Sequence, residues 1–167
     1  LTAIIFFSVN SKNLYADTPH FIDFTKVLNE SLAGAEAQTL LKTKLNKSVK
    51  KFQKLEINLK NEEKDIINQK KLITNEEYQK KVQALRAKAS KLQKDKQKEF
   101  NDIAKLRNSA KEKLLKALNP LIKSYMEEKK IRLVLDKKSI LLGDTNLEIT
   151  SKIIEILNKD LKSLNLK

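Results

Sequence analysis

The longest regular pattern in the chain is a seven-residue repeat of apolar side chains that begins near Leu41. Its core members are Leu45, Phe52, Leu59, Ile66 and Ile73. Lys, Asn, Gln and Glu fill most of the positions between them. An apolar repeat of this spacing on a polar background is typical of a coiled-coil helix. The pattern therefore predicts a long helix from about residue 37 to residue 72.

A second helix is predicted to begin directly after the first. In the segment "TNEEYQKK", Thr74 can accept a hydrogen bond from the backbone N–H of Glu77, while the Glu77 side chain reaches back to the backbone of Thr74. This reciprocal arrangement is a capping box, which marks the N-terminus of a helix.

The second helix carries its own apolar stripe, with polar interruptions at Lys96 and Glu99. The stripe consists of Tyr78, Val82, Leu85, Ala89, Leu92, Ile103, Leu106, Ala110, Leu114, Ala117 and Leu121. Two such helices joined by a tight turn predict an antiparallel hairpin, an arm over residues 37–120. Pro120 predicts a kink at the base of the arm.

Short runs rich in Ile, Leu, Val and Phe flank the arm and predict strands. The first predicted strand is "FIDF" at residues 21–24. After the arm, a two-stranded hairpin is predicted for "IRLVLD" and "SILL". A polar loop and an amphipathic helix follow from residue 143 onwards. Asp23 or Thr25 can cap the helix after the first strand. Gly34 marks either a break in that helix or a close approach of two backbones.

Three short strands bury little apolar surface in one chain and leave sheet edges open. We therefore expect self-association through a small β-containing body of residues 17–36 and 121–167, with a C3 trimer preferred because three chains can close their strands around an axis. The predicted fold is mainly α, with a helical arm projecting from this trimerising body. The residues expected in the trimer's strand layer are Phe21, Ile22, Phe24, Leu133, Val134, Leu135, Ile140 and Leu141.

The N-terminal residues 1–16 resemble the remnant of a secretory signal peptide. Leu1 to Val9 form an apolar run too short to span a bilayer, and Ala16 follows as a cleavage point. A buried N-terminal strand is the alternative. The signal interpretation predicts export, with a mature chain that begins near Asp17.

The positive charge of the chain is concentrated on the arm. The formal net charge is +14; residues 42–130 contain 26 Lys and Arg against 12 Asp and Glu, and the rest of the chain is balanced. Basic arms attract acidic partners in a salt-dependent way. The lysines expected to contact such a partner are Lys50, Lys54, Lys81, Lys88, Lys91 and Lys98, although any of them can instead belong to a merely solvated face.

Alternative partners of a basic helical arm are nucleic acid, anionic lipid and lipopolysaccharide. A further alternative is a purely structural tether whose arm binds no partner of this kind. Against nucleic acid, the arm holds only Arg86 and Arg107 among many lysines, and no zinc-ligand spacing or aromatic stacking platform is present in the sequence.

The residue inventory argues against an enzyme and against metal or cofactor sites. The chain has no Cys and one His, His20, so the sequence offers no thiolate ligands and no histidine-based triad. Glu62, Glu63 and Asp65 are adjacent carboxylates, but on a Lys-rich helix they favour pairs between successive turns over metal coordination.

The order of these elements resembles the Skp (OmpH) family of periplasmic chaperones. The residues that carry the resemblance are "FIDFTKVLNES", the tip "ITNEEYQKKVQAL", and "IRLVLDKKSILL" followed by "LEITSKIIEILN". The resemblance implies a jellyfish-shaped homotrimer whose arms enclose a cavity, and an ATP-independent holdase that keeps unfolded outer-membrane β-barrel proteins soluble in the periplasm. The chain departs from the family pattern at Glu148, where an Asp is common, and at Lys130, where a Gly-containing turn is usual.

Overall fold

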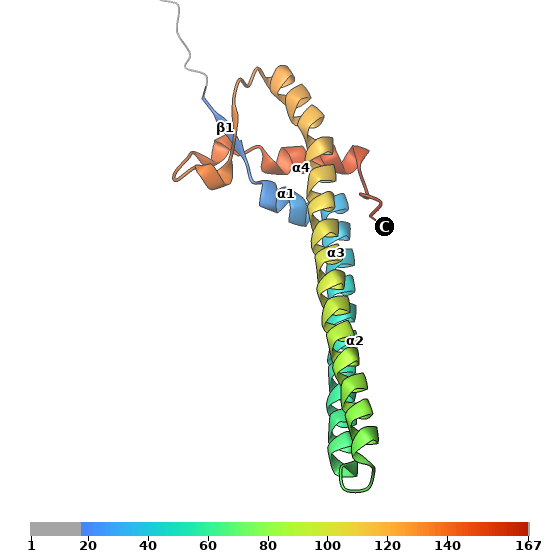
Figure 1. Cartoon of the computed structure of the whole chain (residues 1–167). Helices are drawn as coiled ribbons and strands as arrows, with labels where there is room; N and C mark the ends of the chain where they lie inside the picture. The colour runs from blue at the N-terminus through green and yellow to red at the C-terminus, as the bar shows by residue number, and fades with distance from the viewer. Residues whose placement is uncertain (1–17, 167) are drawn as a thin grey trace, which may run out of the picture.

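The computed structural model describes residues 18–166, and the predicted signal segment therefore lies outside the described residues. Two long helices dominate the structure, and short elements gather at one end (Figure 1). The elements are β1 (His20–Ile22), α1 (Phe24–Glu30), α2 (Leu32–Gln69), α3 (Asn75–Lys129), β2 (Val134–Asp136), two 3-10 turns (Lys137–Ser139 and Thr145–Leu147) and α4 (Thr150–Asp160).

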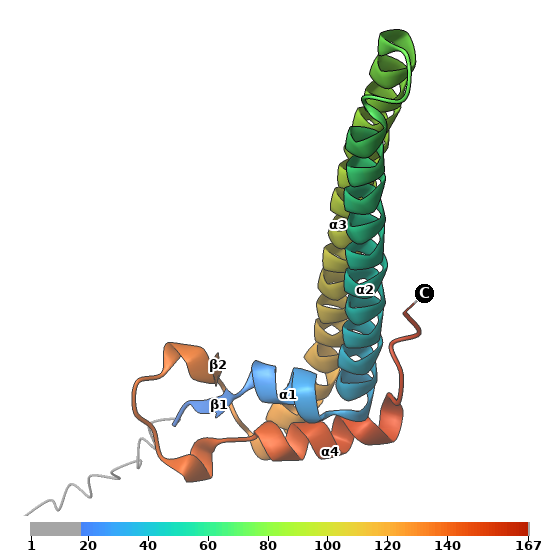
Figure 2. The ribbon, with the colours of Figure 1, turned by 90° about the horizontal axis from the view of Figure 1, so that it is seen from below.

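Helices α2 and α3 form the predicted antiparallel hairpin, which extends away from the short elements (Figures 1 and 2). With 38 residues, α2 is about 57 Å long. The predicted capping box is confirmed, because the Thr74 side chain accepts from the backbone N–H of Glu77 and the Glu77 side chain accepts from the backbone N–H of Thr74. Phe52 and Ile66 of the predicted repeat are buried between the helices, whereas Leu45 is exposed.

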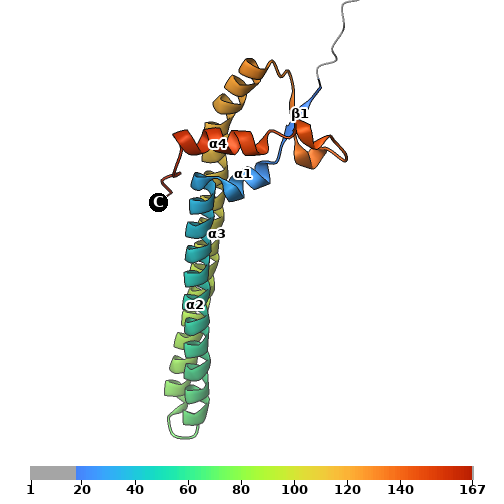
Figure 3. The same cartoon turned by 180° about the vertical axis from the view of Figure 1, so that it is seen from behind.

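The main core lies at the base of the hairpin, where α4 crosses α3 beside the start of α2 (Figure 3). Ile153 and Leu157 of α4 are fully buried there together with Leu114 and Leu118 of α3 and Val27 of α1. The amphipathic stripe of α4 thus has its packing partners within the chain. Helix α3 continues through Pro120, and its ribbon leans away from the hairpin axis beyond the crossing with α4 (Figure 1).

The predicted strand hairpin is wrong. β2 pairs in parallel with β1, with Phe21 opposite Leu135, and the segment "SILL" is not a strand. Asp136 ends β2 because its side chain accepts from the backbone N–H of Lys138 and turns the chain into a 3-10 helix. Ile140 and Leu141 therefore lie in a turn and the loop after it, and the predicted strand positions of these two residues are corrected.

The first predicted strand is also shorter than expected. Asp23 accepts from the backbone N–H of Lys26 and caps α1, as one of the two predicted caps, so Phe24 is the first residue of that helix instead of the last residue of a strand.

The two interpretations of the Gly34 region both describe part of the structure. The helix breaks at Ser31, which ends α1 and caps α2 by accepting from the backbone N–H of Gly34. Gly34 itself is buried against the backbone carbonyl of Leu28, where a Cβ atom would overlap the carbonyl oxygen.

Helix α3 ends in a conformation that usually requires glycine. Lys130 has φ 56° and ψ 32°, and the backbone N–H of Ile131 donates to the carbonyl of Met126 over 2.8 Å, as in a Schellman motif. Lys130 occupies the position where the family resemblance implies a glycine-containing turn, so the chain keeps the turn and carries a side chain in the left-handed region.

We expect Lys130→Gly to stabilise the protein by about 1 kcal/mol, because a Cβ in the left-handed region costs about 1–2 kcal/mol and the greater chain entropy of glycine offsets part of that gain. Urea unfolding at a fixed protein concentration measures the change. Lys116→Gly, at an exposed position inside α3, is the control and should destabilise by about 1 kcal/mol. Equal losses in both variants would contradict the account of this turn.

Candidate functional site

Ion pairs cross the seam between α2 and α3 at several levels of the arm. They join Lys51 to Glu99 over 2.5 Å, Glu56 to Lys96 over 2.6 Å, and Glu62 to Lys88 over 2.5 Å. The two polar interruptions of the α3 stripe, at Lys96 and Glu99, are thus the partners of α2 residues. Each pair joins one turn of α2 to one turn of α3, so the pairs contribute to the register of the hairpin together with its short connection at residues 70–74.

Glu99 is the centre of a polar cluster in the arm. Its carboxylate accepts hydrogen bonds from the Lys51 ammonium and from the hydroxyl of Ser48, and Ser48 is buried. These hydrogen bonds, first that of Lys51 and then that of Ser48, lower the pKa of Glu99 below its ordinary value. The ionised carboxylate therefore stabilises the folded arm at neutral pH.

We expect Glu99→Gln to lower the free energy of unfolding by about 0.5–1 kcal/mol at pH 7, because the amide keeps a partner for Ser48 but loses the charge that faces Lys51. A carboxyl group whose folded pKa is depressed contributes stability that is lost as the pH falls through that pKa. The difference between the wild type and the variant should therefore shrink as the pH falls below the ordinary pKa of a glutamate carboxyl group. A difference that stays constant from pH 7 to pH 3 in urea unfolding would contradict the assigned role.

The structure places the predicted arm lysines in different environments. Lys88 is tied to Glu62, and Lys81 donates to the side-chain oxygen of Gln69 over 3.0 Å. The other predicted lysines are exposed and, within residues 18–166, make no ion pair; they are Lys50, Lys54, Lys91 and Lys98. Lys50 lies on the outer side of α2, two positions before the buried Phe52.

Three adjoining hollows lie along one side of the seam, and together they form what we call the seam groove. Their volumes are about 580, 320 and 280 Å³. Glu99 and Asp102 line both the first and the second hollow, and Leu55, Leu92 and Asp95 line both the second and the third. The groove therefore continues from Lys44 near the arm base to Glu62 farther along α2. It includes Lys88, Lys91 and Lys98 of the predicted set.

At the other end of the molecule, the small sheet has exposed apolar side chains beside it. Leu133 and Leu135 are partly exposed, and Leu141 and Leu142 are 96% and 90% exposed. A hollow of about 510 Å³ lies between the end of α3 and β2, and Leu115, Ile122 and Met126 help to line it. By contrast, the predicted interface residues Phe21 and Ile22 are buried within the chain, while Phe24 and Val134 are partly buried and line this hollow.

The sheet itself is small and has an open edge. It has two strands, of which β1 also makes an isolated bridge to Glu148 through Phe21. β1 therefore lies between β2 and Glu148, and the far edge of β2 has no strand partner in the described chain. An unpaired edge beside exposed leucines is a surface that can accept a further strand.

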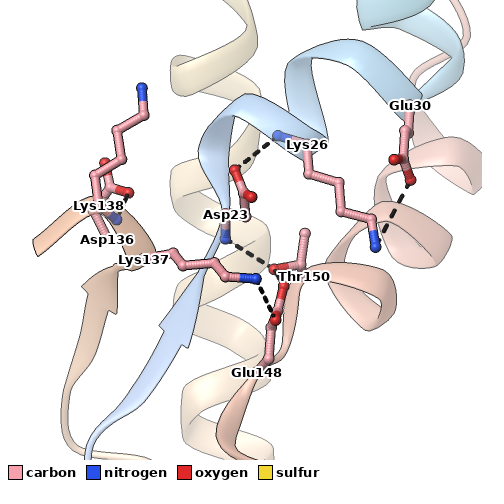
Figure 4. A network of polar contacts seen from close by, with 8 residues as sticks. All are labelled: Asp23, Lys26, Glu30, Asp136, Lys137, Lys138, Glu148 and Thr150. Carbon is pink, nitrogen blue, oxygen red and sulfur yellow. Dashed lines mark hydrogen bonds and ion pairs between the residues drawn. The ribbon is translucent and has the colours of Figure 1, made fainter. Parts of the chain in front are cut away.

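A polar network fixes the end of this sheet to the start of α4 (Figure 4). The backbone N–H of Asp23 donates to the Thr150 hydroxyl over 2.8 Å, and that hydroxyl donates to Glu148 over 2.8 Å. Lys137 completes the network through an ion pair of 2.8 Å with Glu148. The hydrogen bonds from Lys137 and then from Thr150 lower the pKa of Glu148, and the bond to Glu148 raises the pKa of Lys137. The network ties together segments that are more than a hundred residues apart in sequence.

Comparison with protein families supplies the decisive observation. A family model described as "Outer membrane protein (OmpH-like)" matches residues 20–157, which include the sheet, the whole hairpin and most of α4. The chain belongs to this OmpH-like family. Among curated proteins, none matches the chain significantly.

The fold of this OmpH-like chain also occurs in a solved structure. An OmpH-like protein from Caulobacter crescentus CB15, described as an outer membrane chaperone, is similar with a TM-score of 0.78 and 21% sequence identity. The similarity covers 89% of each chain. It establishes the hairpin with its small body as a shared fold.

Within the described part of the chain, no three His, Cys, Asp or Glu side chains are grouped so that they could hold a metal ion. None of the helices in residues 18–166 is both long and apolar enough to cross a membrane.

Sequence reasoning missed several residues of the exposed apolar surface of the OmpH-like body. The apolar pattern places Leu142 in the predicted strand "SILL" but not among the expected interface residues, and it gives Leu115, Ile122 and Met126 no role beyond that of the long helix. The signal for Ile122 and Met126 is that they lie beyond the level at which α2 begins, where an apolar side chain has no α2 residue to face. Leu115 lies beside the start of α2 and is exposed.

Proposed function

We propose that this OmpH-like protein is an ATP-independent periplasmic chaperone that holds unfolded outer-membrane β-barrel proteins and prevents their aggregation. The observation that carries the proposal is a strongly basic helical arm that projects far from the core of a chain with the OmpH-like fold. Such an arm offers a long surface to a chain that has no fixed shape.

The working form is proposed to be a homotrimer with C3 symmetry, in which three arms surround a cavity. The open edge of β2 and the exposed Leu141 and Leu142 support this proposal, because both need a partner that a second copy can provide. Each copy then contributes one arm, and the positive arms repel one another across the cavity.

The proposed mechanism uses many weak contacts and needs no fuel. Exposed lysines attract acidic side chains over about one Debye length, roughly 8–10 Å at moderate salt. Individual contacts of exposed charges are worth little, so a bound segment can leave the arm and rebind repeatedly. The client is released when its own folding buries the segments that the arms contact.

The test is an aggregation assay on the full chain. A β-barrel outer-membrane protein is diluted from urea with and without the chaperone, and light scattering follows its aggregation. We expect suppression without ATP, no change when ATP is added, and weaker suppression when salt rises from about 0.05 M to about 0.5 M, which shortens the Debye length severalfold. Unchanged aggregation in the presence of the protein would refute the proposed function.

A further inference from the structure

The two sides of the hairpin seam differ in charge. The seam groove is lined by seven lysines and four carboxylates, and two of those carboxylates, Glu62 and Glu99, are already paired across the seam. The hollow on the other side has about 550 Å³ and is lined by Lys60 and Arg86 with Glu56 and Glu63. The seam groove therefore carries an excess of positive charge, whereas the hollow on the other side of the seam is balanced.

The lysines of the seam groove are available to a ligand. Lys51 and Lys88 bind the groove's own Glu99 and Glu62, but five others make no ion pair within the described residues. These are Lys44, Lys47, Lys91, Lys98 and Lys105. The groove has two carboxylates that make no ion pair within the described residues, Asp95 and Asp102, against these five lysines.

The bottom of the groove is apolar. The part of the groove nearer the tip of the arm is lined by Leu55, Leu59 and Leu92. The part near the base of the arm is lined by Ile103 and Leu106. Apolar side chains of a ligand can therefore contact the bottom while its acidic side chains meet the lysines at the rim.

The length of the groove matches a short extended segment. Between Lys44 and Glu62, helix α2 rises about 27 Å. An extended chain advances about 3.3 Å per residue, so the groove can hold about eight residues. That is close to the 9–11 residues of a transmembrane β-strand, in which apolar and polar side chains alternate. In an extended segment of this kind, every second side chain faces the apolar bottom of the groove and the others face the lysines at its rim.

We propose that the seam groove is the client-binding face of the arm, and that it takes one extended, strand-length segment of alternating apolar and polar or acidic residues. This inference rests on the proposed function and specifies where on the arm the client lies. The opposite face, around Lys60 and Glu63, takes no client.

Two charge-reversal variants test the inference. The groove variant carries Lys47→Glu, Lys98→Glu and Lys105→Glu. The matched control carries Lys64→Glu, Lys80→Glu and Lys94→Glu, on the outer sides of α2 and α3, so both variants change the net charge equally. All six lysines are exposed and outside the ion pairs of the seam.

Affinity is measured with a urea-unfolded β-barrel protein and with a labelled ten-residue peptide that alternates Val and Asp. We expect the groove variant to bind both probes at least tenfold more weakly and the control to bind within about twofold of the wild type, by the charge complementarity of the groove. A photo-crosslinking residue should also label the client from position 91 in the groove and not from position 94 on the outer side.

The outcomes separate this inference from the proposed function. Equal weakening in both variants, or equal labelling from both positions, overturns the groove as the binding face while the chaperone activity stands. A groove variant that loses binding to phosphatidylglycerol vesicles or to an oligonucleotide but still binds the unfolded barrel also overturns it. Failure of the wild type to bind the barrel at all refutes the proposed function and the inference together.

Discussion

Replacing Leu141 and Leu142 together with Asp is expected to convert the assembled protein to folded monomers. Their side chains are 96% and 90% exposed in the single chain, so the substitutions remove almost no contact within it. In an assembly that covers these leucines, the same substitutions place two unpaired charges in an apolar interface, which costs several kcal/mol. Light-scattering mass at about 10 μM should fall from that of a trimer to that of a monomer, while the helical circular dichroism stays the same.

The matched control for this double variant is Leu72→Asp at the tip of the hairpin. Leu72 is 81% exposed and lies at the opposite end of the arm from the sheet. The control should keep the mass of the wild type. A double Asp variant with an unchanged mass would show that the loop after β2 takes no part in assembly.

Gly34→Ala is expected to have the largest effect on the stability of the single chain, with a loss of about 3 kcal/mol. A Cβ at this position would overlap the carbonyl oxygen of Leu28 and would lie 2.8 Å from both the carbonyl carbon of Leu28 and the Ser31 hydroxyl oxygen. Two of these atoms belong to the backbone, so α1 has to shift away from α2 to make room. Urea unfolding at a fixed protein concentration measures the loss.

Gly143→Ala is the control for this change, because the second glycine of the chain lies in an exposed loop. A Cβ there would meet the Phe21 ring at 3.3 Å, and a small shift of the loop relieves the contact. We expect a loss below about 1 kcal/mol. Similar losses in both variants would contradict the close approach of α1 and α2 as the reason for Gly34.

The arm could be predicted from sequence because its signals are local. The seven-residue repeat and the Thr74–Glu77 capping box each depend on residues within two helical turns, and both are present in the structure. The register of the hairpin was less accessible. The repeat says which side of α2 faces α3, whereas contacts such as the Glu62–Lys88 pair show which turns meet.

The small sheet was predicted incorrectly because its pairing is long-range. Composition suggested that "SILL" folds back on the preceding strand, yet β2 pairs with β1, which lies more than a hundred residues earlier. A local signal against the hairpin is Asp136, whose side chain caps a 3-10 turn between the two predicted strands. The seam groove could not be located either, because its lining comes from two helices whose register depends on the cross-seam pairs.

The most direct test of the central claim is the light-scattering mass of the full chain alone and after mixing with a β-barrel protein diluted from urea. The account predicts a trimer by itself and a soluble complex of defined stoichiometry with the client, which dissociates as salt is added. A trimer that leaves the client to aggregate would contradict the holdase function, and a monomer would contradict the proposed assembly.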